Sequence, residues 1–473
     1  MTYIIRLSTI LIFFISCTTT RAQEVWDWNK CLQYALDNNI QIRQDALNIS
    51  LAELQTQQDR LGLTPYAQAT SAYTYALGRT VDMSTYEYVT KPVSTGNLQV
   101  SVTQPIFEGL KNINTLKKSK LDLKASRLDN ETLKQNIQLQ VMNAYLNILN
   151  AQEQVQQAKE QLDISTTQRS HNQKLIDAGS LAEKAIADND AQVASDEYNV
   201  AQLNQQLQLA YLALKAVLQL DFNRDIVIAQ PPLTHKIKVE DLSPADKIYQ
   251  EALKHRPEIA SALTKKESAQ LGLKIAKAAY MPTLSLFSGV GTNLSDQITE
   301  TVGTTTQETP IGYVKNTGDA VYTLIPQPEL APMRFGKQII NNISYAFGLN
   351  LTIPIYNRRA GYFSKKRADI SLLQAEINEQ DISNKLFQNI QEAYLKAITS
   401  EQNFNAAQKS LTAAQKSLDY AQERYNFGAI SQLEFNLAQN NLLMSKSRLT
   451  QAKYDYLFNV KVLDFYSGKP IDF

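Results

Sequence analysis

Few side chains of this sequence are spaced so that they could catalyse a reaction or hold a metal ion. The three histidines, His171, His235 and His255, lie far apart and show none of the short spacings that bind zinc. The acidic groupings Asp188-Asn189-Asp190 and Glu240-Asp241 lack the glycine and distal glutamate of a calcium loop, and we interpret them as solvated helix and linker residues. The residues therefore predict no enzyme, no cofactor and no metal site.

The two cysteines, Cys17 and Cys31, bear on export rather than on catalysis. Residues 1–22 combine a basic start, an apolar stretch over residues 7–15 and small residues just before Gln23, which is typical of a secretory signal peptide. Removal of this signal leaves one cysteine, so no internal disulfide is predicted. The alternative is a weak lipidation signal that leaves Cys17 lipidated, and the sequence leaves both readings open.

The charge balance and the apolar segments narrow the class of protein. With 47 basic and 46 acidic side chains, the chain has no basic excess that would favour nucleic acid as a partner. After the first segment, no stretch reaches about 18 consecutive apolar residues, so no later helix is predicted to cross a membrane. Membrane insertion would then require a closed β-barrel, because lipid satisfies no unpaired backbone group.

An internal duplication organises the chain. Residues 31–39 resemble residues 248–256, and Pro65 corresponds to Pro282 at the same sequence offset. At a second, larger offset, residues 105–107 correspond to 354–356, residues 144–146 to 393–395, and Gly179 to Gly428. The second copy is longer, and we expect its extra residues to form an enlarged loop in the Thr-rich stretch around Thr299–Pro310.

Each copy contains a long helical pattern. From Lys111 to Ala178 there is no proline or glycine, and apolar side chains recur at spacings of three and four. At about 1.5 Å per residue this predicts a helix of about 100 Å. Gly179 interrupts the pattern and a second helix follows, which gives a helical hairpin over about 108–218. The second copy repeats the hairpin over about 358–466, with Gly428 at its turn.

Segments of period two predict four strands, over about 65–78, 97–106, 282–295 and 343–355. The residues opposite the apolar ones are small and polar, which favours a water-filled lumen over the alternative of a small sheet on a soluble core. Pro105 and Pro354 are expected to end two strands. Five tyrosines near the first pair are placed as an aromatic girdle would be: Tyr66, Tyr73, Tyr75, Tyr86 and Tyr88.

The predicted fold is mainly α with membrane β-strands. We expect a signal peptide at 1–22, a first repeat at 23–246 that ends in a linker at 219–246, and a second repeat at 247–473. Four strands cannot close a barrel, since the smallest outer-membrane barrels have about eight. Two chains would supply eight strands and three would supply twelve, and a wide duct favours twelve.

Five short motifs occur in order within this duplicated frame: Leu32-x-x-Ala35-Leu36-x-Asn38-Asn39, Gln104-Pro105-Ile106-Phe107, Ile353-Pro354-Ile355-Tyr356, Tyr425-Asn426-Phe427-Gly428-Ala429 and Ala438-Gln439-Asn440-Asn441-Leu442. By these motifs the chain resembles the TolC-like outer-membrane efflux proteins along essentially its whole mature length. The resemblance implies a homotrimer with a 12-stranded β-barrel in the outer membrane and a periplasmic barrel of 12 helices. It also implies a passive conduit for efflux or type I secretion, with a periplasmic adaptor (membrane fusion protein) and an inner-membrane pump or secretion ATPase as partners.

The same resemblance assigns roles to the hairpin tips. The implied adaptor contacts are Gly179, Ser180, Leu181, Ala182, Gly428, Ala429, Ile430 and Ser431. The two glycines are equally explained as simple helix ends. Tyr425 and Glu434 match a tyrosine and an acidic residue that gate such channels, whereas Ile430, Leu437 and Ala185 replace the other charged gate residues. Closure by apolar packing of Leu181, Tyr425 and Ile430 is therefore expected.

One other class of function remains open from the sequence. An exported structural or adhesive coiled-coil protein without channel activity would also have an export signal and long helices. It would not explain why amphipathic strands recur at the same place in both copies.

Overall fold

The computed structural model describes residues 24–81, 86–180, 182–231 and 244–471. The predicted signal peptide with Cys17, and also Leu181, His235 and Glu240-Asp241, lie outside the described residues. The chain divides into two compact units. The first unit contains Met1–Glu53, Leu121–Glu267 and Gln374–Phe473, and the second contains Leu54–Lys120 and Ser268–Leu373.

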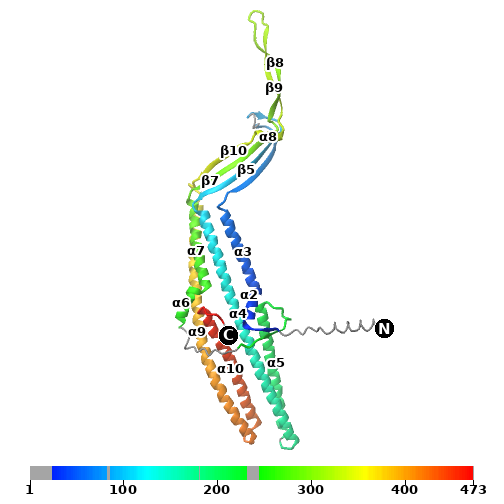
Figure 1. Cartoon of the computed structure of the whole chain (residues 1–473), viewed down its shortest axis with the longest axis vertical. Coiled ribbons are helices and arrows are strands. Elements are labelled where there is room, and N and C mark those ends of the chain that lie inside the picture. The colour runs from blue at the N-terminus through cyan, green and yellow to red at the C-terminus, as the bar shows by residue number, and fades with distance from the viewer. Residues whose placement is uncertain (1–23, 82–85, 181, 232–243, 472–473) are drawn as a thin grey trace, which may run out of the picture. The chain divides into compact units, whose positions relative to one another are not determined.

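Helices dominate the fold, and strands interrupt them in each half of the sequence (Figure 1). The helices are α2 (Trp28–Asn38), α3 (Ile40–Leu61), α4 (Lys111–Asp177), α5 (Lys184–Leu218), α6 (Ala245–His255), α7 (Pro257–Lys277), α8 (Phe335–Asn341), α9 (Ala360–Asn426) and α10 (Gln432–Tyr466). The strands are β1 (Glu24–Trp26), β2 (Tyr66–Ala76), β3 (Thr80–Val81), β4 (Tyr88–Val89), β5 (Val93–Glu108), β6 (Ile226–Ile228), β7 (Thr283–Ser295), β8 (Thr299–Tyr313), β9 (Ala320–Pro332) and β10 (Ser344–Thr352). The predicted mainly helical fold with strands is confirmed at this level.

The long helices come in pairs of equal length. α4 and α9 each have 67 residues, and α5 and α10 each have 35. α4 contains no proline or glycine, and α9 has only Gly361 in its first turn, so nothing breaks either backbone ladder. α2 and α6 also match, at 11 residues each. The two halves of the chain therefore contain corresponding helices in the same order.

The core of the first unit joins residues that are remote in sequence. β1 pairs in parallel with β6, so that Trp26 lies opposite Ile228. The indole Nε1 of Trp28 donates a 3.0 Å hydrogen bond to the carbonyl of Ile471. A cluster of fully buried side chains surrounds these contacts: Cys31, Ile137, Met142, Tyr145, Ile148, Leu149, Leu214 and Leu218. Apolar burial thus holds α2, α4 and α5 together in this unit.

The second unit contains a four-stranded antiparallel sheet in the order β10-β7-β5-β2. Each long helix that follows the sheet begins after two residues in the left-handed region. Gly109 and Leu110 have φ values of 61° and 62° before α4, and Arg358 and Arg359 have 55° and 59° before α9. A Cβ on Gly109 would lie 2.6 Å from Met281 Cβ, so close packing as well as backbone conformation requires glycine there.

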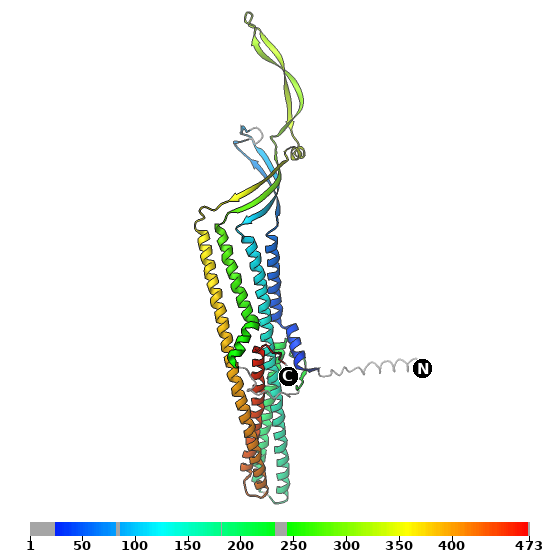
Figure 2. The ribbon, with the colours of Figure 1, turned by 60° about the vertical axis from the view of Figure 1, so that its left-hand side comes forward.

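Two expectations for this unit are wrong. The stretch around Thr299–Pro310 is not a loop: it forms β8, which pairs with β9 in a long antiparallel hairpin (Figure 2). Its β-branched threonines favour extended backbone, which explains the strand. Pro105 does not end its strand either, because β5 continues to Glu108 through an irregularity between Pro105 and Phe107. A bulge of this kind tolerates the missing proline N–H.

Within the described ranges, no helix has an apolar stretch long enough to cross a lipid bilayer.

Candidate functional site

The four-stranded sheet has one apolar face. Side chains alternate between the faces of a sheet, and paired residues share a face. Leu351 pairs with Leu284, Leu349 with Leu286, and Val290 with Val100. Following this register, the apolar face carries Tyr345, Phe347, Leu349 and Leu351 of β10, Leu284, Leu286, Val290 and Leu294 of β7, Leu98, Val100 and Val102 of β5, and Ala67, Ala69, Tyr73 and Tyr75 of β2. Many of these side chains are exposed in the single chain, which indicates that this face is covered by something else.

The opposite face is polar and built from small side chains. It carries Ser344, Gly348, Asn350 and Thr352 of β10, Thr283, Ser285, Gly289 and Asn293 of β7, Asn97, Gln99, Ser101 and Thr103 of β5, and Gln68, Thr70 and Thr74 of β2. Two aromatic side chains also lie on this face: Phe287, paired with Gly348, and Tyr66 at the start of β2, paired with Thr103. A Cβ on Gly348 would be 2.8 Å from two atoms of the Phe287 ring, so the glycine makes room for it.

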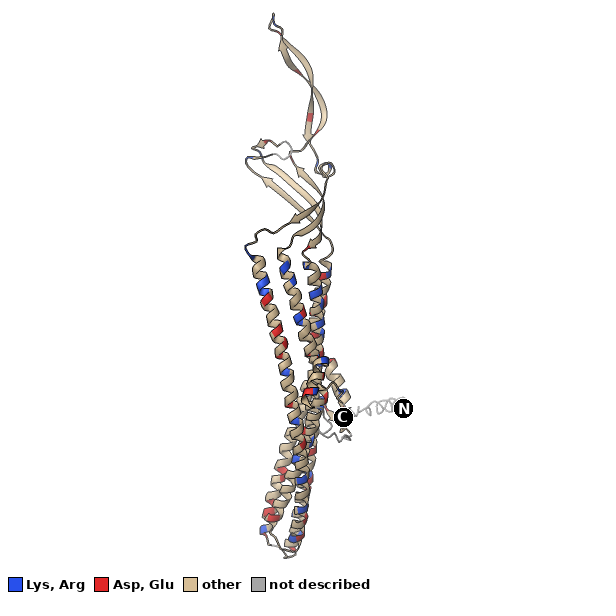
Figure 3. Ribbon diagram, turned by 90° about the vertical axis from the view of Figure 1, so that its left-hand side faces the viewer, with Lys and Arg blue, Asp and Glu red and all other residues tan. Residues whose placement is uncertain are grey.

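Charge is nearly absent from this sheet. Among the residues of β2, β5, β7 and β10, only Glu108 at the end of β5 is charged. Figure 3 shows the same contrast, because Lys, Arg, Asp and Glu are spread along the helices and leave the sheet strands bare. An uncharged sheet with one apolar and one small polar face fits lipid on one side and water on the other.

The two edges of this sheet are open. β2 and β10 are the outer strands, and no strand in the described part of the chain pairs with their free edges. The two helices that continue these edges, α3 and α9, have exposed apolar stripes with spacings of three, four or seven. The stripes are Leu47, Leu51, Leu54 and Leu61 on α3, and Ile370, Leu373 and Ile377 on α9, all more than half exposed. Such stripes are typical of helices that pack against partner helices.

The two hairpin tips share one backbone geometry. Gly179 and Gly428 have φ values of 71° and 68°. Ser180 N donates to Leu175 O and Gly179 N to Ile176 O, both at 2.8 Å, and Ala429 N and Gly428 N repeat this pattern at 2.8 and 2.9 Å. This paired arrangement is the Schellman motif, which satisfies the last helix carbonyls and requires a left-handed residue. The glycines are thus explained as helix ends, while Ser180, Ala182, Ala429 and Ser431 stay exposed and Ile430 is half-buried.

The expected gate residues, Tyr425 and Glu434, contact other groups. The Tyr425 ring stacks on Phe435, with centroids 5.0 Å apart and planes 11° from parallel. The Glu434 carboxylate accepts a 3.0 Å hydrogen bond from Ser431 N, and Ser431 Oγ accepts from Glu434 N, which forms a capping box at the start of α10. Among the described residues, the structure shows no hydrogen bond between Tyr425 and Glu434.

A polar cluster that the sequence analysis missed joins α4 to α10. The Glu153 carboxylate accepts hydrogen bonds from Thr450, Lys453 and Tyr454 at 3.2, 2.9 and 3.1 Å. Burial and the nearby Glu153 charge raise the pKa of Tyr454 above its usual value. The spacing of Thr450, Lys453 and Tyr454 places three donors on one face of α10, and this could be read from the sequence. The acceptor Glu153 lies in the other half of the chain, so its position opposite them could not be predicted.

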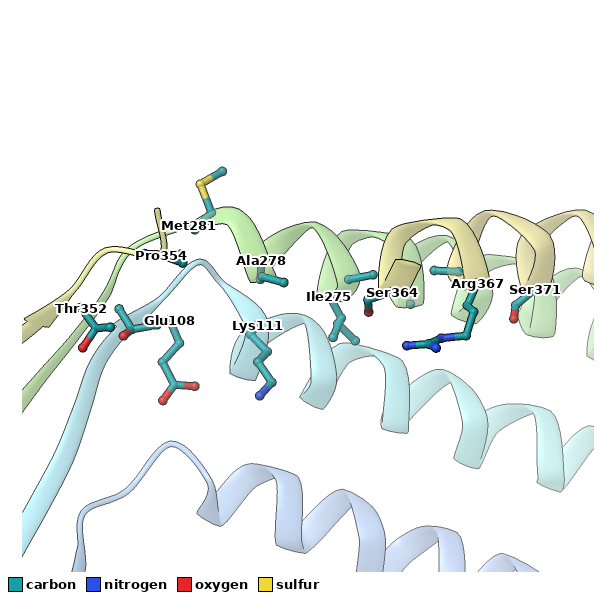
Figure 4. Close-up of a pocket in the computed structure, with 15 residues that line it drawn as sticks. Glu108, Lys111, Ile275, Ala278, Met281, Thr352, Pro354, Ser364, Arg367 and Ser371 are labelled. Atoms are coloured by element: carbon teal, nitrogen blue, oxygen red, sulfur yellow. The ribbon is translucent and has the colours of Figure 1, made fainter. Parts of the chain in front are cut away.

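An open cavity of about 710 Å³ lies in the second unit where strands give way to helices. Glu108 and Lys111 line it from the end of β5 and the start of α4, and Arg367 lines it from α9. Figure 4 shows these three side chains extending to the same side of the ribbon. Elsewhere in the described ranges, no three His, Cys, Asp or Glu side chains gather closely enough to hold a metal ion.

The outer membrane efflux protein family matches residues 31–218 and 248–469 of this chain. The chain therefore belongs to this family, whose members are TolC-like outer membrane channels rather than enzymes. By family it is an outer membrane efflux channel protein, and the resemblance inferred from its motifs is confirmed.

Individual relatives are distant in sequence but close in fold. The structure resembles the outer membrane channel CmeC of Campylobacter jejuni with a TM-score of 0.74 and 21% identity, over 93% of this chain and 85% of the other. It resembles VceC of Vibrio cholerae with a TM-score of 0.73 and 16% identity, over 94% and 97%. Two curated relatives match shorter stretches: the probable outer membrane lipoprotein SilC of Salmonella typhimurium, 22% identical over 57% of this chain and 48% of its own length, and the cation efflux system protein CusC of Escherichia coli, 24% identical over 43% and 36%. The matched stretch thus spans about half or less of these curated relatives.

Proposed function

We propose that three copies of the chain close their sheets into one 12-stranded β-barrel in the outer membrane and form a passive efflux conduit. The observation that carries this proposal is the four-stranded sheet with two open edges, one apolar face and one small polar face. Twelve strands would give each copy the same environment, with the apolar face toward lipid and the polar face toward a water-filled lumen. The helices would continue the conduit into the periplasm as a barrel of twelve.

The exposed stripes on α3 and α9 support the same assembly. α3 precedes the edge strand β2 and α9 follows the edge strand β10. Joining β2 of one copy to β10 of the next would therefore also bring α3 beside α9. Leucine and isoleucine stripes at coiled-coil spacing bury apolar area in such a contact. A symmetric ring of identical contacts leaves no edge strand unpaired.

The division of the chain follows from the duplication. We propose a signal peptide at 1–22 and two repeats at 23–246 and 247–473, each of which supplies two strands and one helical hairpin. The equal lengths of α4 and α9, and of α5 and α10, support this division.

The partners would be a periplasmic adaptor and an inner-membrane pump or secretion ATPase. One curated relative, CusC, is named as part of a cation efflux system, which supports a pump assembly for this chain too. The adaptor would contact the tips at Gly179, Ser180, Leu181, Ala182, Gly428, Ala429, Ile430 and Ser431. Leu181, Tyr425 and Ile430 would close the conduit by apolar packing, while Glu434 would hold the start of α10.

Light scattering of the detergent-extracted, unheated protein, with the detergent contribution subtracted, tests the assembly. We expect a particle of about three times the mass of one chain, 53.2 kDa before any processing. A monomer or dimer that dissolves without detergent would contradict the conduit and favour a structural coiled-coil protein.

A further inference from the structure

The cavity at the strand–helix junction lies on the polar face of the sheet. Glu108 pairs with Thr283, and Thr283 pairs with Thr352, so these three side chains share one face. Leu284 and Leu351, one position further along, lie on the apolar face. All three polar residues line the cavity. In the proposed conduit, the cavity therefore opens toward the lumen and not toward lipid.

Two basic side chains from different helices meet at this cavity. Lys111 is the first residue of α4, and Arg367 lies in the third turn of α9. Both are exposed, and neither forms an ion pair or hydrogen bond with the side chains of the described residues. Glu108 is the one acidic residue that lines the cavity, so its wall carries two positive charges against one negative charge.

The remaining wall offers hydrogen-bonding groups and an apolar floor. Thr283, Thr352, Ser364 and Ser371 supply hydroxyl groups. Ile275 and Ala276 of α7, and Ala278 just after α7, supply apolar surface. A volume of about 710 Å³ is within the range of sites for drug-sized ligands.

The strands next to the cavity carry no other charged side chain. Apart from the Phe287 and Tyr66 rings, the strands present small, hydroxyl and amide side chains along the polar face, and none of these is charged. Lys111, Arg367 and Glu108 are the charged residues that line the cavity where the sheet ends. Arginine binds carboxylate, sulfonate and phosphate groups through directed hydrogen bonds, and lysine adds a mobile positive charge.

We propose that this cavity, the junction site, is a binding station for amphipathic organic anions inside the conduit. Arg367 and Lys111 hold the anionic group, the four hydroxyl residues complete its hydrogen bonds, and the α7 floor contacts the apolar part. Glu108 weakens the positive field and so limits how tightly an anion is held. The site rests on the proposed conduit, because its place on the lumen side depends on that assembly.

Planar-bilayer recordings of the purified full-length channel test the junction site, with 1-naphthalenesulfonate as the probe and uncharged 1-naphthalenemethanol as its control. In a KCl gradient, we expect the wild type to pass chloride more readily than potassium. The double variant K111Q/R367Q should lower the chloride-to-potassium permeability ratio at least about twofold and raise the half-blocking sulfonate concentration at least about fivefold. E108Q should shift both readouts in the opposite direction.

The matched control is K277Q, which removes a positive charge from an exposed position of α7 that does not line the cavity. It should behave as the wild type in both readouts. If K111Q/R367Q and K277Q are indistinguishable while the channel conducts, the junction site does not hold anions. Equal block by the alcohol and the sulfonate would also overturn the proposal. A wild type that never conducts contradicts the conduit itself, which is a different failure.

Discussion

Cys31 lies in the interior of the first unit, in the same buried cluster as Trp28 and Tyr145. Burial raises the pKa of its thiol to about 12. The ordinary thiol pKa is about 8.5, so the reactive thiolate is scarce here at neutral and mildly alkaline pH. The side chain serves as a small apolar group in the packing of α2, and its reactivity reports on whether that packing is intact.

We expect native Cys31 to resist alkylation by iodoacetamide at pH 8, and to react fully once the protein is unfolded in guanidinium chloride. Peptide mass spectrometry gives the labelled fraction at Cys31 in each state. A short synthetic peptide with one exposed cysteine, added to the same tube, controls for reagent activity. Rapid labelling of the native protein at Cys31 would show that α2 is not packed as described.

The apolar stripe on α3 faces away from the contacts that α3 makes within its own chain. Thr56 Oγ1, on the inner side of the helix, donates to Ser119 O of α4 at 3.2 Å. Leu47, Leu51 and Leu54 lie on the exposed side. Leaving three leucines in water forfeits about 1.5–3 kcal/mol of burial energy for each side chain. This cost favours an interface position for α3, as the proposed trimer requires.

The substitution Leu51→Lys should therefore lower the trimer fraction in detergent strongly, because it places a charge in the middle of the stripe. Asn48→Lys is the matched control, since Asn48 is exposed on α3 outside the stripe. Light scattering and unheated gel electrophoresis measure the trimer fraction of each variant. Equal trimer fractions for both variants would remove α3 from the interface.

The tips of the two hairpins lie far along the sequence from each other, yet both belong to the first unit. Asn172 near one tip donates to Gln432 near the other, at 3.5 Å. The exposed groups at and after the two turn glycines are small, and their backbone is fixed by the two Schellman motifs. A rigid, small-residue tip lets a partner approach the backbone closely, which suits an adaptor that must recognise the assembled channel.

A photo-crosslinking amino acid at position 430 should therefore capture a periplasmic adaptor in living cells, because Ile430 lies in one of these tips. The same amino acid at position 209 is the control, since Leu209 is exposed on α5 away from the tips. Mass spectrometry of the crosslinked products identifies the partner. Capture of the same proteins at both positions, or of no adaptor at position 430, would argue against tip docking.

Local patterns predicted much of this fold. The alternation that ends in Leu349, Leu351 and Ile353 predicts β10, because a sheet with one apolar face imposes period two on its residues. The pattern from Lys111 to Ala178 predicts α4, since no residue in it breaks a helix. Thr299–Pro310 was misjudged because length alone cannot distinguish a loop from a hairpin, and the pairing of β8 with β9 depends on residues further along the chain.

The candidate sites were harder to predict than the elements. Gly179 and Gly428 could be predicted because the left-handed residue that ends a helix is usually glycine, which is visible in the sequence. The junction site was missed because Lys111, Thr283 and Arg367 come from distant parts of the sequence and come together only in the folded second unit. Glu434 caps the start of α10, and its spacing in the sequence alone could not distinguish this capping role from a gating role.

The β8–β9 hairpin has a consequence for how this protein can be labelled. Its strands pair with each other, and the prolines of β9, Pro326, Pro328 and Pro332, remove donors that a further strand would need. The hairpin therefore forms its own two-stranded sheet, and its prolines disfavour the pairing of a further strand with its edge. Its turn contains Gly318, where a Cβ would meet no atom within 4 Å beyond its chain neighbours, so this position leaves room for an epitope or fluorophore. Such a tag would report on export while leaving the four-stranded sheet, its edges and the hairpin tips unaltered.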